Sequence, residues 1–508
     1  MSTAVSTTSL CDLSAAQIRA GYLSGDFTPS EVMGSMLARI REVNGGRATG
    51  INAFTEVLDD EATSQAASAT ERLNTARRRG DRLPPLFGIP VATKEKHALA
   101  GRTLEQGLAA HRGRIADADH PIVERIRAAG GIIHARTTSP EFSCATVTHS
   151  PMLGITRNPY NLAASPGGSS GGAGAALAAG MATLATASDI AGSTRIPAGF
   201  TGTVGYKAPY GRIPGAPPLS ADTYRGDGPM ARTVDDTALL ADVMSGHHHS
   251  DHFSWGSSGQ LADTLDGHTS LDGVRVGISI TLGDFDVHPD VASATLRAAE
   301  ALRQRGAEVV DVTLPWRSDE IRETIFAHFG HLLAPAMRAE TAGGPTVAAY
   351  TEQFMRDAEA AAQRLSHLDS VAADARLQAQ LASAMADVDA LLCPVSAVTS
   401  LAADGNYLDG IDVVGPDAAP VHLQHYWQAH LTSPFNVANR CPVLAVPAGI
   451  ARDGVPIGVQ LVGKPLDEVT PFRLGRAVED ALGVPSWREA HARDSAPSET
   501  APRRVDAQ

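Results

Sequence analysis

The 508-residue chain is poor in aromatic residues and in lysine, and it has no long hydrophobic run. Aromatic residues make up 5% of the chain, which disfavours a surface that stacks nucleobases. The formal net charge is -14, which does not suit the basic stripe typical of a nucleic-acid-binding protein. No apolar run reaches the roughly 18 residues that a membrane-spanning helix needs. The sequence therefore predicts a protein that binds neither nucleic acid nor a membrane.

Cysteine is equally scarce, and its four positions form no C-x-x-C motif: Cys11, Cys144, Cys393 and Cys441. Thiols so far apart favour a reduced, cytoplasmic protein over a disulfide framework. The first residues lack both the basic and the apolar region of a signal peptide, which agrees with a cytoplasmic location.

Only four of the 42 basic side chains are lysines: Lys94, Lys96, Lys207 and Lys464. Lys94 ends the apolar run LFGIPVATK (86–94), which has the pattern of a buried strand and its exit. A lysine is ordinarily at the surface. The apolar run and the scarcity of lysine instead favour a specific role for Lys94.

Helical and strand-like segments alternate along most of the chain. Helices are expected at 59–79, 172–181 and 289–305, and strands at 86–94, 183–187, 274–280 and 308–313. Segment 121–137 combines a helix, a glycine stop and a strand. This alternation predicts an α/β fold whose sheet is covered by helices on both faces.

No repeat or clear linker divides the chain, so one continuous domain is expected over 1–487. Residues 1–80 are expected to form an N-terminal helical arm, and 317–430 a largely helical insertion or cap. The polar, proline-containing segment 488–508 is expected to be a disordered tail.

The Gly/Ser-rich segment 164–214 allows three interpretations. A flexible linker is one, but the segment leads directly into an apolar helix and a strand. A phosphate-binding loop is the second, but neither GxxxxGK[ST] nor GxGxxG is present. The third is a nucleophilic site, in which small residues let the backbone approach a substrate closely and present its N–H groups. We favour the third.

Ser193 lies in the tight segment 189–193, where several backbone amides can converge on one point. Serine is a weak nucleophile and needs a base. No G-x-S-x-G elbow, the usual setting of a serine–histidine pair, surrounds it. A serine–lysine arrangement is the known variant, and Lys94 is the natural candidate for its base.

Several motifs resemble the amidase signature family: GGSSGGAGAALAAG, SDIAGSTRIPA, GIPVATKE and NPYNLAASPGGSSGG. The resemblance extends over roughly 10–487 and includes GPMART (228–233), PFNVANRCPVLAVP (434–447) and GVPIGVQLVG (454–463). Within the family, the chain resembles bacterial amidases and the hydrolases of nylon oligomers and urethanes. The resemblance implies the family fold, a mixed central β-sheet with helices on both faces.

The resemblance also implies a role for each residue of the site. Ser193 would be the acyl-forming nucleophile, Ser169 the bridging serine held in a cis peptide, and Lys94 the terminal base. The oxyanion hole would use the N–H groups of Ile190, Ala191, Gly192 and Ser193. Supporting residues would be Asp189, Arg195, Ser170 and Gly168.

This relay needs a neutral lysine, so the pKa of Lys94 must fall by two to three units, a bias of roughly 3–4 kcal/mol. Burial acts in that direction because it disfavours the ammonium form. The relay uses no metal and no cofactor.

The sequence departs from the commonest family pattern at three positions: Ser188 replaces Thr, Ala191 replaces Gly, and Glu95 replaces Asp. If position 191 required a positive φ, alanine would cost on the order of 1 kcal/mol. Nylon-oligomer hydrolases share the Ala-Gly-Ser sequence, so we expect the alanine to be tolerated. None of the changes removes a catalytic group.

The predicted function is hydrolysis of a small or medium linear amide, with aryl amides, carbamates (urethanes) and esters as further candidates. The alternative is the A subunit of a glutamyl-tRNA amidotransferase, although that protein typically carries Gln where this chain has Ile196. A scaffold with an inactive site is a third interpretation. The expected partner is a small-molecule substrate, and a homodimer is left open.

Two other groups of residues admit a functional interpretation. The histidines of 247–249 with His252 suggest a metal site, but their segment has the composition of a solvated loop, which we favour. Tyr426, Trp427 and Phe435 are expected in the core, with pocket lining as the alternative.

Overall fold

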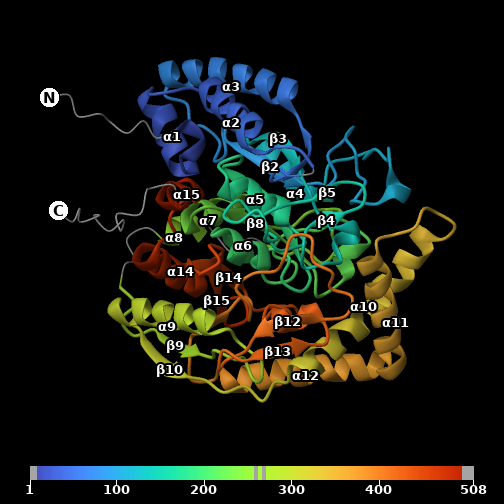
Figure 1. Ribbon diagram of the computed structural model, residues 1–508. Helices are drawn as coiled ribbons and strands as arrows, with labels where there is room; N and C mark the ends of the chain where they lie inside the picture. The colour runs from blue at the N-terminus through green and yellow to red at the C-terminus, as the bar shows by residue number, and fades with distance from the viewer. Residues whose placement is uncertain (1–8, 48, 257–260, 266–269, 495–508) are drawn as a thin grey trace, which may run out of the picture.

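A computed structural model describes residues 9–47, 49–256, 261–265 and 270–494. An 11-stranded sheet runs through the molecule (Figure 1). Its strands, in spatial order, are β1 (Phe54–Val57), β3 (Ile132–Thr137), β2 (Pro90–Lys94), β6 (Leu184–Asp189), β8 (Gly226–Ala231), β7 (Val204–Lys207), β14 (Val443–Ile450), β15 (Pro456–Gly463), β11 (Ala390–Pro394), β9 (Arg275–Ile278) and β10 (Glu308–Asp311). Strand β2 is parallel to β3 and β6, whereas β6 is antiparallel to β8. The sheet is mixed, as predicted.

Helices lie on both sides of this sheet and at both of its ends (Figure 1). They are α1 (Ala15–Ser24), α2 (Pro29–Val43), α3 (Asp59–Arg79), α4 (Pro121–Ala128), α5 (Gly171–Ala178), α6 (Arg195–Thr201), α7 (Val234–Met244), α8 (Leu261–Leu265), α9 (Pro289–Gln304), α10 (Ser318–Thr341), α11 (Ala349–Arg364), α12 (His367–Ala384), α13 (Pro434–Val437), α14 (Val469–Leu482) and α15 (Trp487–Asp494). Outside the main sheet, β4 (His149–Ser150) pairs with β5 (Gly154–Ile155), and β12 (Ile411–Val414) pairs with β13 (Pro420–Leu423).

Two helices show how both faces of the sheet are covered. A Cβ on Gly458 of β15 would lie 2.4 Å from the Cα of Gly199, so α6 packs closely on this face because both residues are glycines. On the neighbouring strand, a Cβ on Gly475 of α14 would lie 2.4 Å from the side chain of Leu444. Gly458 and Leu444 occupy opposite faces, since Leu444 pairs with Leu461 and successive residues of a strand alternate.

The two strands that carry the site are fully buried. Every residue of β2 and β6 is buried, as expected of short strands in the middle of a sheet covered on both faces. Because the two strands are parallel, their carboxyl ends lie at the same edge. β2 ends at Lys94 and β6 at Asp189, which brings two distant segments of the chain together.

Two segments that were predicted as helical also contain strands. The N-terminal arm 1–80 is not wholly helical, because β1 pairs antiparallel with β3. The insertion 317–430 is helical from α10 to α12, but β11 then joins the central sheet and β12 and β13 form a hairpin. A short apolar strand such as ALLCP (390–394) has too few residues for its hydrophobic pattern to distinguish a strand from a helix.

The tail prediction is wrong for 488–494, which continue helix α15. The start of this helix has the S-x-x-E pattern of a capping box, since Ser486 N donates to Glu489 (2.8 Å) and Glu489 N donates to Ser486 Oγ (3.4 Å). Residues 495–508 lie outside the described residues.

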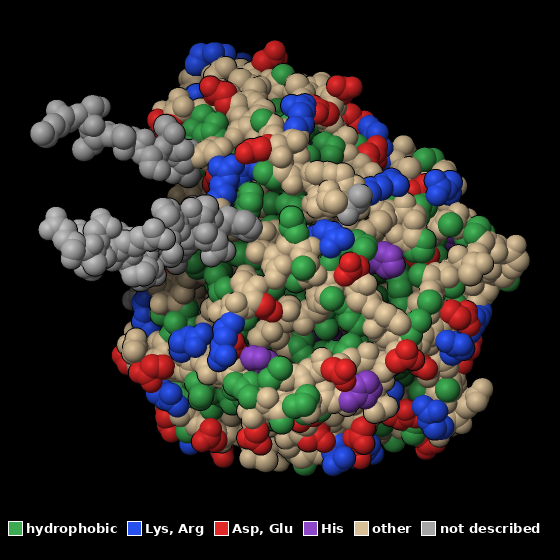
Figure 2. Space-filling view, viewed as in Figure 1, with side chains coloured by type: hydrophobic (Ala, Val, Ile, Leu, Met, Phe, Trp, Pro, Cys, Tyr) green, Lys and Arg blue, Asp and Glu red, His purple; other side chains and the backbone are tan. Residues whose placement is uncertain are grey.

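In Figure 2 acidic and basic side chains are intermingled, most densely along the upper and lower parts of the visible face, and the middle of the face carries few of either. No helix among the described residues is long and apolar enough to cross a membrane.

Candidate active site

Lys94 lies at the centre of the site, and its side chain is fully buried. Its Nζ is within hydrogen-bonding distance of three serine hydroxyls: Ser169 at 2.7 Å, Ser170 at 3.0 Å and Ser188 at 3.1 Å. No carboxylate in the described part of the chain forms an ion pair with Lys94.

These surroundings favour the neutral amine. Burial places the pKa of Lys94 well below its usual value, and the nearby charge of Lys96 lowers it further. The carboxylates of Asp227 and Asp189 act in the opposite direction but do not overcome burial. A neutral amine has a lone pair, so Lys94 can accept a proton from one of the hydroxyls around it.

Glycines allow the serine segment to reach this lysine. A Cβ on Gly168 would lie 2.6 Å from the carbonyl oxygen of Val147, and one on Gly171 would lie 2.3 Å from Thr148 Oγ1. The peptide bond between Gly168 and Ser169 is cis, as the resemblance implies. Ser169 and Ser170 are both fully buried directly before α5.

The loop after β6 is held by one buried carboxylate. Asp189 accepts hydrogen bonds from the backbone N–H of Gly192 (2.7 Å) and Thr194 (3.3 Å) and from Arg195 Nε (3.0 Å). Burial by itself raises the pKa of Asp189, but the charge and hydrogen bonds of Arg195 and the amide of Asn436 outweigh it and hold the pKa at about 2. Asp189 is therefore an anion that fixes the loop.

Arg195 completes this brace from the opposite side. It is fully buried and donates to Thr432 O (2.8 Å), Gln460 Oε1 (2.9 Å) and Asn436 Oδ1 (2.7 Å), in addition to Asp189. Three segments that are distant in sequence, 189–195, 432–436 and the strand that carries Gln460, thus meet on one guanidinium.

Ser193 lies in this braced loop and retains 8% of its surface, whereas Lys94, Ser169 and Ser170 retain none. Its carbonyl oxygen accepts a hydrogen bond from Ser170 N (3.2 Å), which joins the two serine segments. Its hydroxyl has no hydrogen-bond partner among the described residues. The structure thus brings Lys94 and Ser169 into direct contact and places Ser193 beside them with its hydroxyl unbonded.

One of the four amides predicted to form the oxyanion hole is already occupied. The N–H of Gly192 donates to Asp189 (2.7 Å), so it is already engaged before a substrate binds. The N–H groups of Ile190, Ala191 and Ser193 make no hydrogen bond within the described chain. The oxyanion hole stays a prediction, and these three amides are the ones left free to form it.

The structure explains why two departures from the family pattern are tolerated. Gly192, at φ 123°, has the left-handed conformation, whereas Ala191 does not, so alanine is unstrained there. The longer Glu95 accepts hydrogen bonds from the backbone N–H of Glu105 and of Gln106 (2.8 Å), and so tethers the following loop.

Sequence reasoning missed several residues of the site. Ser188, treated as a mild substitution, is the third hydroxyl on Lys94. Thr186 accepts from the backbone N–H of Lys94 (2.9 Å) and contacts His97 Nδ1 (2.8 Å), whose Nε2 is paired with Asp227 (3.0 Å). Thr186 and Ser188 are two residues apart on β6, so their side chains lie on the same face of the sheet. This spacing of two hydroxyl residues was the signal that the sequence offered. Nothing local in the sequence links His97 to Asp227.

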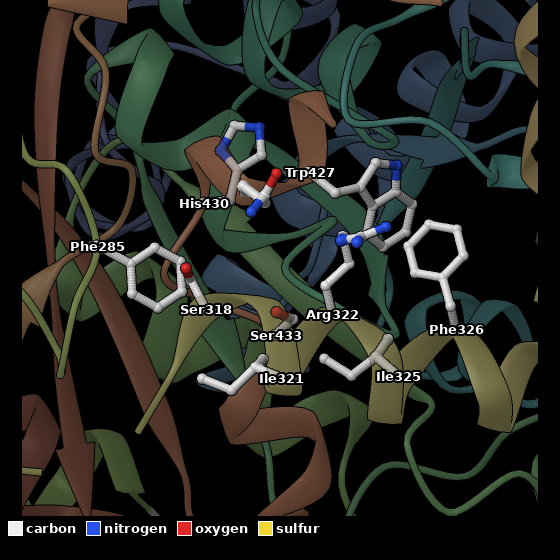
Figure 3. A pocket seen from close by; sticks show the side chains of 10 residues that line it. Phe285, Ser318, Ile321, Arg322, Ile325, Phe326, Trp427, His430 and Ser433 are labelled. Carbon is white, nitrogen blue, oxygen red and sulfur yellow. The ribbon is translucent and has the colours of Figure 1, made fainter. Parts of the chain in front are cut away.

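The three candidate aromatic residues have different positions. Tyr426 and Phe435 are buried in the interior, as expected by default. Trp427 instead lines a pocket between α10 and the segment 427–433 (Figure 3). The pocket is narrow, and most of the space at it is open to solvent.

The histidine segment is a loop in which His247, His249 and His252 are exposed and His248 pairs with Glu124 (3.0 Å). Within the described ranges, no group of three or more His, Cys, Asp or Glu side chains could hold a metal ion.

The fold matches that of a known class of enzyme. A solved bacterial aryl acylamidase of the amidase signature family superposes with a TM-score of 0.82 at 23% identity, and the match covers 96% of this chain and 99% of that one. This similarity shows the amidase-signature fold.

Sequence comparison shows the family. The amidase family profile matches residues 31–471, so the chain belongs to the amidase family, whose members hydrolyse amide C–N bonds. An acylamidase of Rhodococcus erythropolis is 30% identical over 95% of this chain and 98% of that protein. The A subunit of the glutamyl-tRNA(Gln) amidotransferase of Synechococcus sp. (strain CC9311) is 30% identical over 92% of this chain and 96% of that protein.

Proposed function

We propose that the chain hydrolyses a small or medium linear amide through an acyl-enzyme on Ser193, with Ser169 as the bridging hydroxyl and Lys94 as the base. The observation that supports this most strongly is the buried Lys94 amine, which contacts three hydroxyls and forms no ion pair within the described residues. A lysine with a structural role would ordinarily be paired with a carboxylate when buried.

The first half of the reaction follows from these contacts. Neutral Lys94 takes the proton of Ser169, and Ser169 takes the proton of Ser193. The hydroxyl of Ser193 attacks the substrate carbonyl carbon. This transfer requires a hydrogen bond between the two serine hydroxyls, which forms as the substrate closes the site, since catalytic hydrogen bonds are often long in free enzymes.

The tetrahedral oxyanion is bound by the unbonded N–H groups of Ile190, Ala191 and Ser193. Because Asp189 and Arg195 hold this loop rigidly, the peptide dipoles need no reorganisation during the reaction. Each such donor is worth about 10²–10³ in rate.

The second half returns the protons. Lys94 gives its proton back through Ser169 to the leaving nitrogen, and the C–N bond breaks. Water then donates a proton into the same relay and attacks the acyl carbon, which releases the acid and restores Ser193. The same chemistry applies to aryl amides, carbamates and esters, which we include as candidate substrates.

The glutaminase-type A subunit is a second candidate because several relatives of 29–31% identity have that role. The residue after Arg195 argues against this second candidate. The A subunit typically has Gln there, whereas Ile196 is 1% exposed and offers no polar group. Activity of the purified chain alone on a simple anilide supports the independent amidase. Activity that requires partner subunits supports the alternative.

The direct test combines Ser193→Ala with a fluorophosphonate probe that labels active serines. We expect the variant to lose anilide hydrolysis and labelling while its unfolding midpoint stays unchanged. Ser250→Ala, on the exposed loop, is the matched control and should keep both. Hydrolysis at the normal rate in Ser193→Ala would overturn the assignment.

A further inference from the structure

Arg322 differs from the other arginines around helix α10. Arg317 pairs with Asp319 (3.4 Å), Arg338 with Glu352 (2.7 Å), and Arg364 with Glu323 (2.6 Å). Arg322 makes no ion pair and no hydrogen bond within the part of the chain that the structure describes, and its Nε is buried without a partner. The molecule thus holds one unmatched cation at this point of the helix.

The guanidinium of Arg322 belongs to the pocket that Trp427 lines. In Figure 3 its side chain rises from α10 toward Trp427. Aromatic side chains form much of the wall, namely Phe285, Phe326 and Trp427. Such walls exclude water, and they strengthen any interaction of the cation with an anion.

The inner wall of this pocket is continuous with the proposed catalytic loop. Ser433 lines the pocket, and its neighbour Thr432 donates a hydrogen bond from Oγ1 to the carbonyl oxygen of Ala191 (2.6 Å). His430 lines it too and contacts Thr146 Oγ1 (3.0 Å) in the segment against which Gly168 packs. A substrate held at this pocket therefore lies against a segment, 430–433, that contacts the loop of Ser193 and the segment packed on Gly168.

Asp357, on α11, does not neutralise Arg322. The carboxylate of Asp357 is paired with His425 (3.4 Å). Arg322 acts on His425 only through its charge, which lowers the pKa of that histidine after the larger effect of burial. The positive charge thus remains available to a ligand.

We propose that this pocket binds a carboxylate on the substrate, so that the enzyme's preferred amides have an apolar body and one anionic end. The aromatic walls take the body, and Arg322 takes the carboxylate through paired N–H donors, a geometry that guanidinium and carboxylate share. The inference rests on the proposed function, since it names the substrate class of the same site.

Two matched pairs of anilides test it, in which a methyl group replaces the carboxylate. Succinanilate and butyranilide differ at the acyl end, and 4-acetamidobenzoate and 4-methylacetanilide differ at the leaving group. We expect the wild-type chain to favour the anion in one pair by at least tenfold in kcat/KM. Arg322→Gln should reduce that preference to about twofold, mainly through KM, and Arg322→Lys should restore part of it.

Arg317→Gln is the matched control, because it removes one positive charge from the start of the same helix, where the side chain is 60% exposed. It should leave the preference unchanged. Equal kcat/KM for the two members of both pairs would overturn the proposal, and so would a preference for the anion that persists in Arg322→Gln. Hydrolysis of the neutral anilides reports separately whether the amidase activity is present.

Calorimetry separates this outcome from failure of the catalytic proposal. In Ser193→Ala, succinanilate or 4-acetamidobenzoate should bind at least tenfold more tightly than its neutral partner, and adding Arg322→Gln should abolish the difference. This readout needs no turnover. Binding of neither anion, or equal binding of each pair, contradicts the carboxylate pocket.

Discussion

Two basic side chains, Lys94 and Arg195, are fully buried at the site, and their surroundings are opposite in kind. Lys94 faces three serine hydroxyls. Arg195 faces the carboxylate of Asp189 at 2.9 Å and three further oxygen acceptors.

The difference shows that burial by itself does not decide the charge of a side chain. Burial removes the charge of an amine that has no counter-ion, because desolvation then has no compensation. A guanidinium keeps its charge when a carboxylate and carbonyl groups satisfy its donors. The site uses the first case for proton transfer and the second to hold a loop.

The largest effect is expected when Lys94 is replaced by an arginine, which keeps its charge when buried. Lys94→Arg and Lys94→Met both remove the base, so anilide hydrolysis should fall by at least 10²–10⁴ in each. Only Lys94→Arg buries a permanent charge without a carboxylate, so it should lose several kcal/mol more stability in urea unfolding than Lys94→Met. Equal stability of the two variants would show that the site tolerates a cation.

The second prediction removes the carboxylate that pairs with Arg195. Asp189→Asn should reduce the free energy of unfolding by about 3–5 kcal/mol, because the guanidinium stays buried and charged. Asp480→Asn breaks the exposed pair with Arg305 (3.1 Å) and should cost less than about 1 kcal/mol. Similar losses in both variants would contradict the special role of the buried pair.

The stability of the wild-type chain should also depend on pH through Lys94. Its pKa is lowered on folding, so below the unfolded value the unfolded chain binds the extra proton and folding is penalised as pH falls. Each pH unit between the two pKa values is worth about 1.4 kcal/mol. Lys94→Met should therefore gain stability relative to the wild type from pH 9 to pH 6, as urea unfolding measures, and a constant difference would mean that Lys94 folds with its charge.

The smallest effect concerns the third hydroxyl. Ser188→Ala removes one hydrogen bond to Lys94 Nζ, worth about 1 kcal/mol, and should slow anilide hydrolysis about five- to tenfold. Ser188→Thr keeps the hydroxyl and should stay near the wild-type rate. Ser169→Ala should lose far more, and equal losses in Ser169→Ala and Ser188→Ala would leave the bridging role unassigned.

The sequence predicted those parts of the site that are local. Lys94 ends a buried apolar strand, and the glycines around Ser169 mark a close backbone approach, so both could be singled out without a structure. The helix predicted at 59–79 from its Ala, Glu and Arg content has the bounds of α3, and Gly80 caps its end.

Contacts between distant segments could not be predicted in this way. Asn436 donates to Asp189 across 247 positions, and Gln460 contacts Arg195 across 265. The signal that was available is a polar residue inside an apolar strand, as Gln460 is in β15. That signal shows that a partner exists but not which one, because the partner depends on the order of strands in the sheet.

The scarcity of lysine permits a direct measurement. A sample labelled with ¹⁵N in its lysine side chains contains four Nζ signals, and Lys94→Met identifies one of them. We expect that signal to have the chemical shift of a neutral amine at pH 7 and to become charged only at lower pH. An ammonium signal at pH 7 that titrates near the ordinary lysine value would contradict the proposed proton relay.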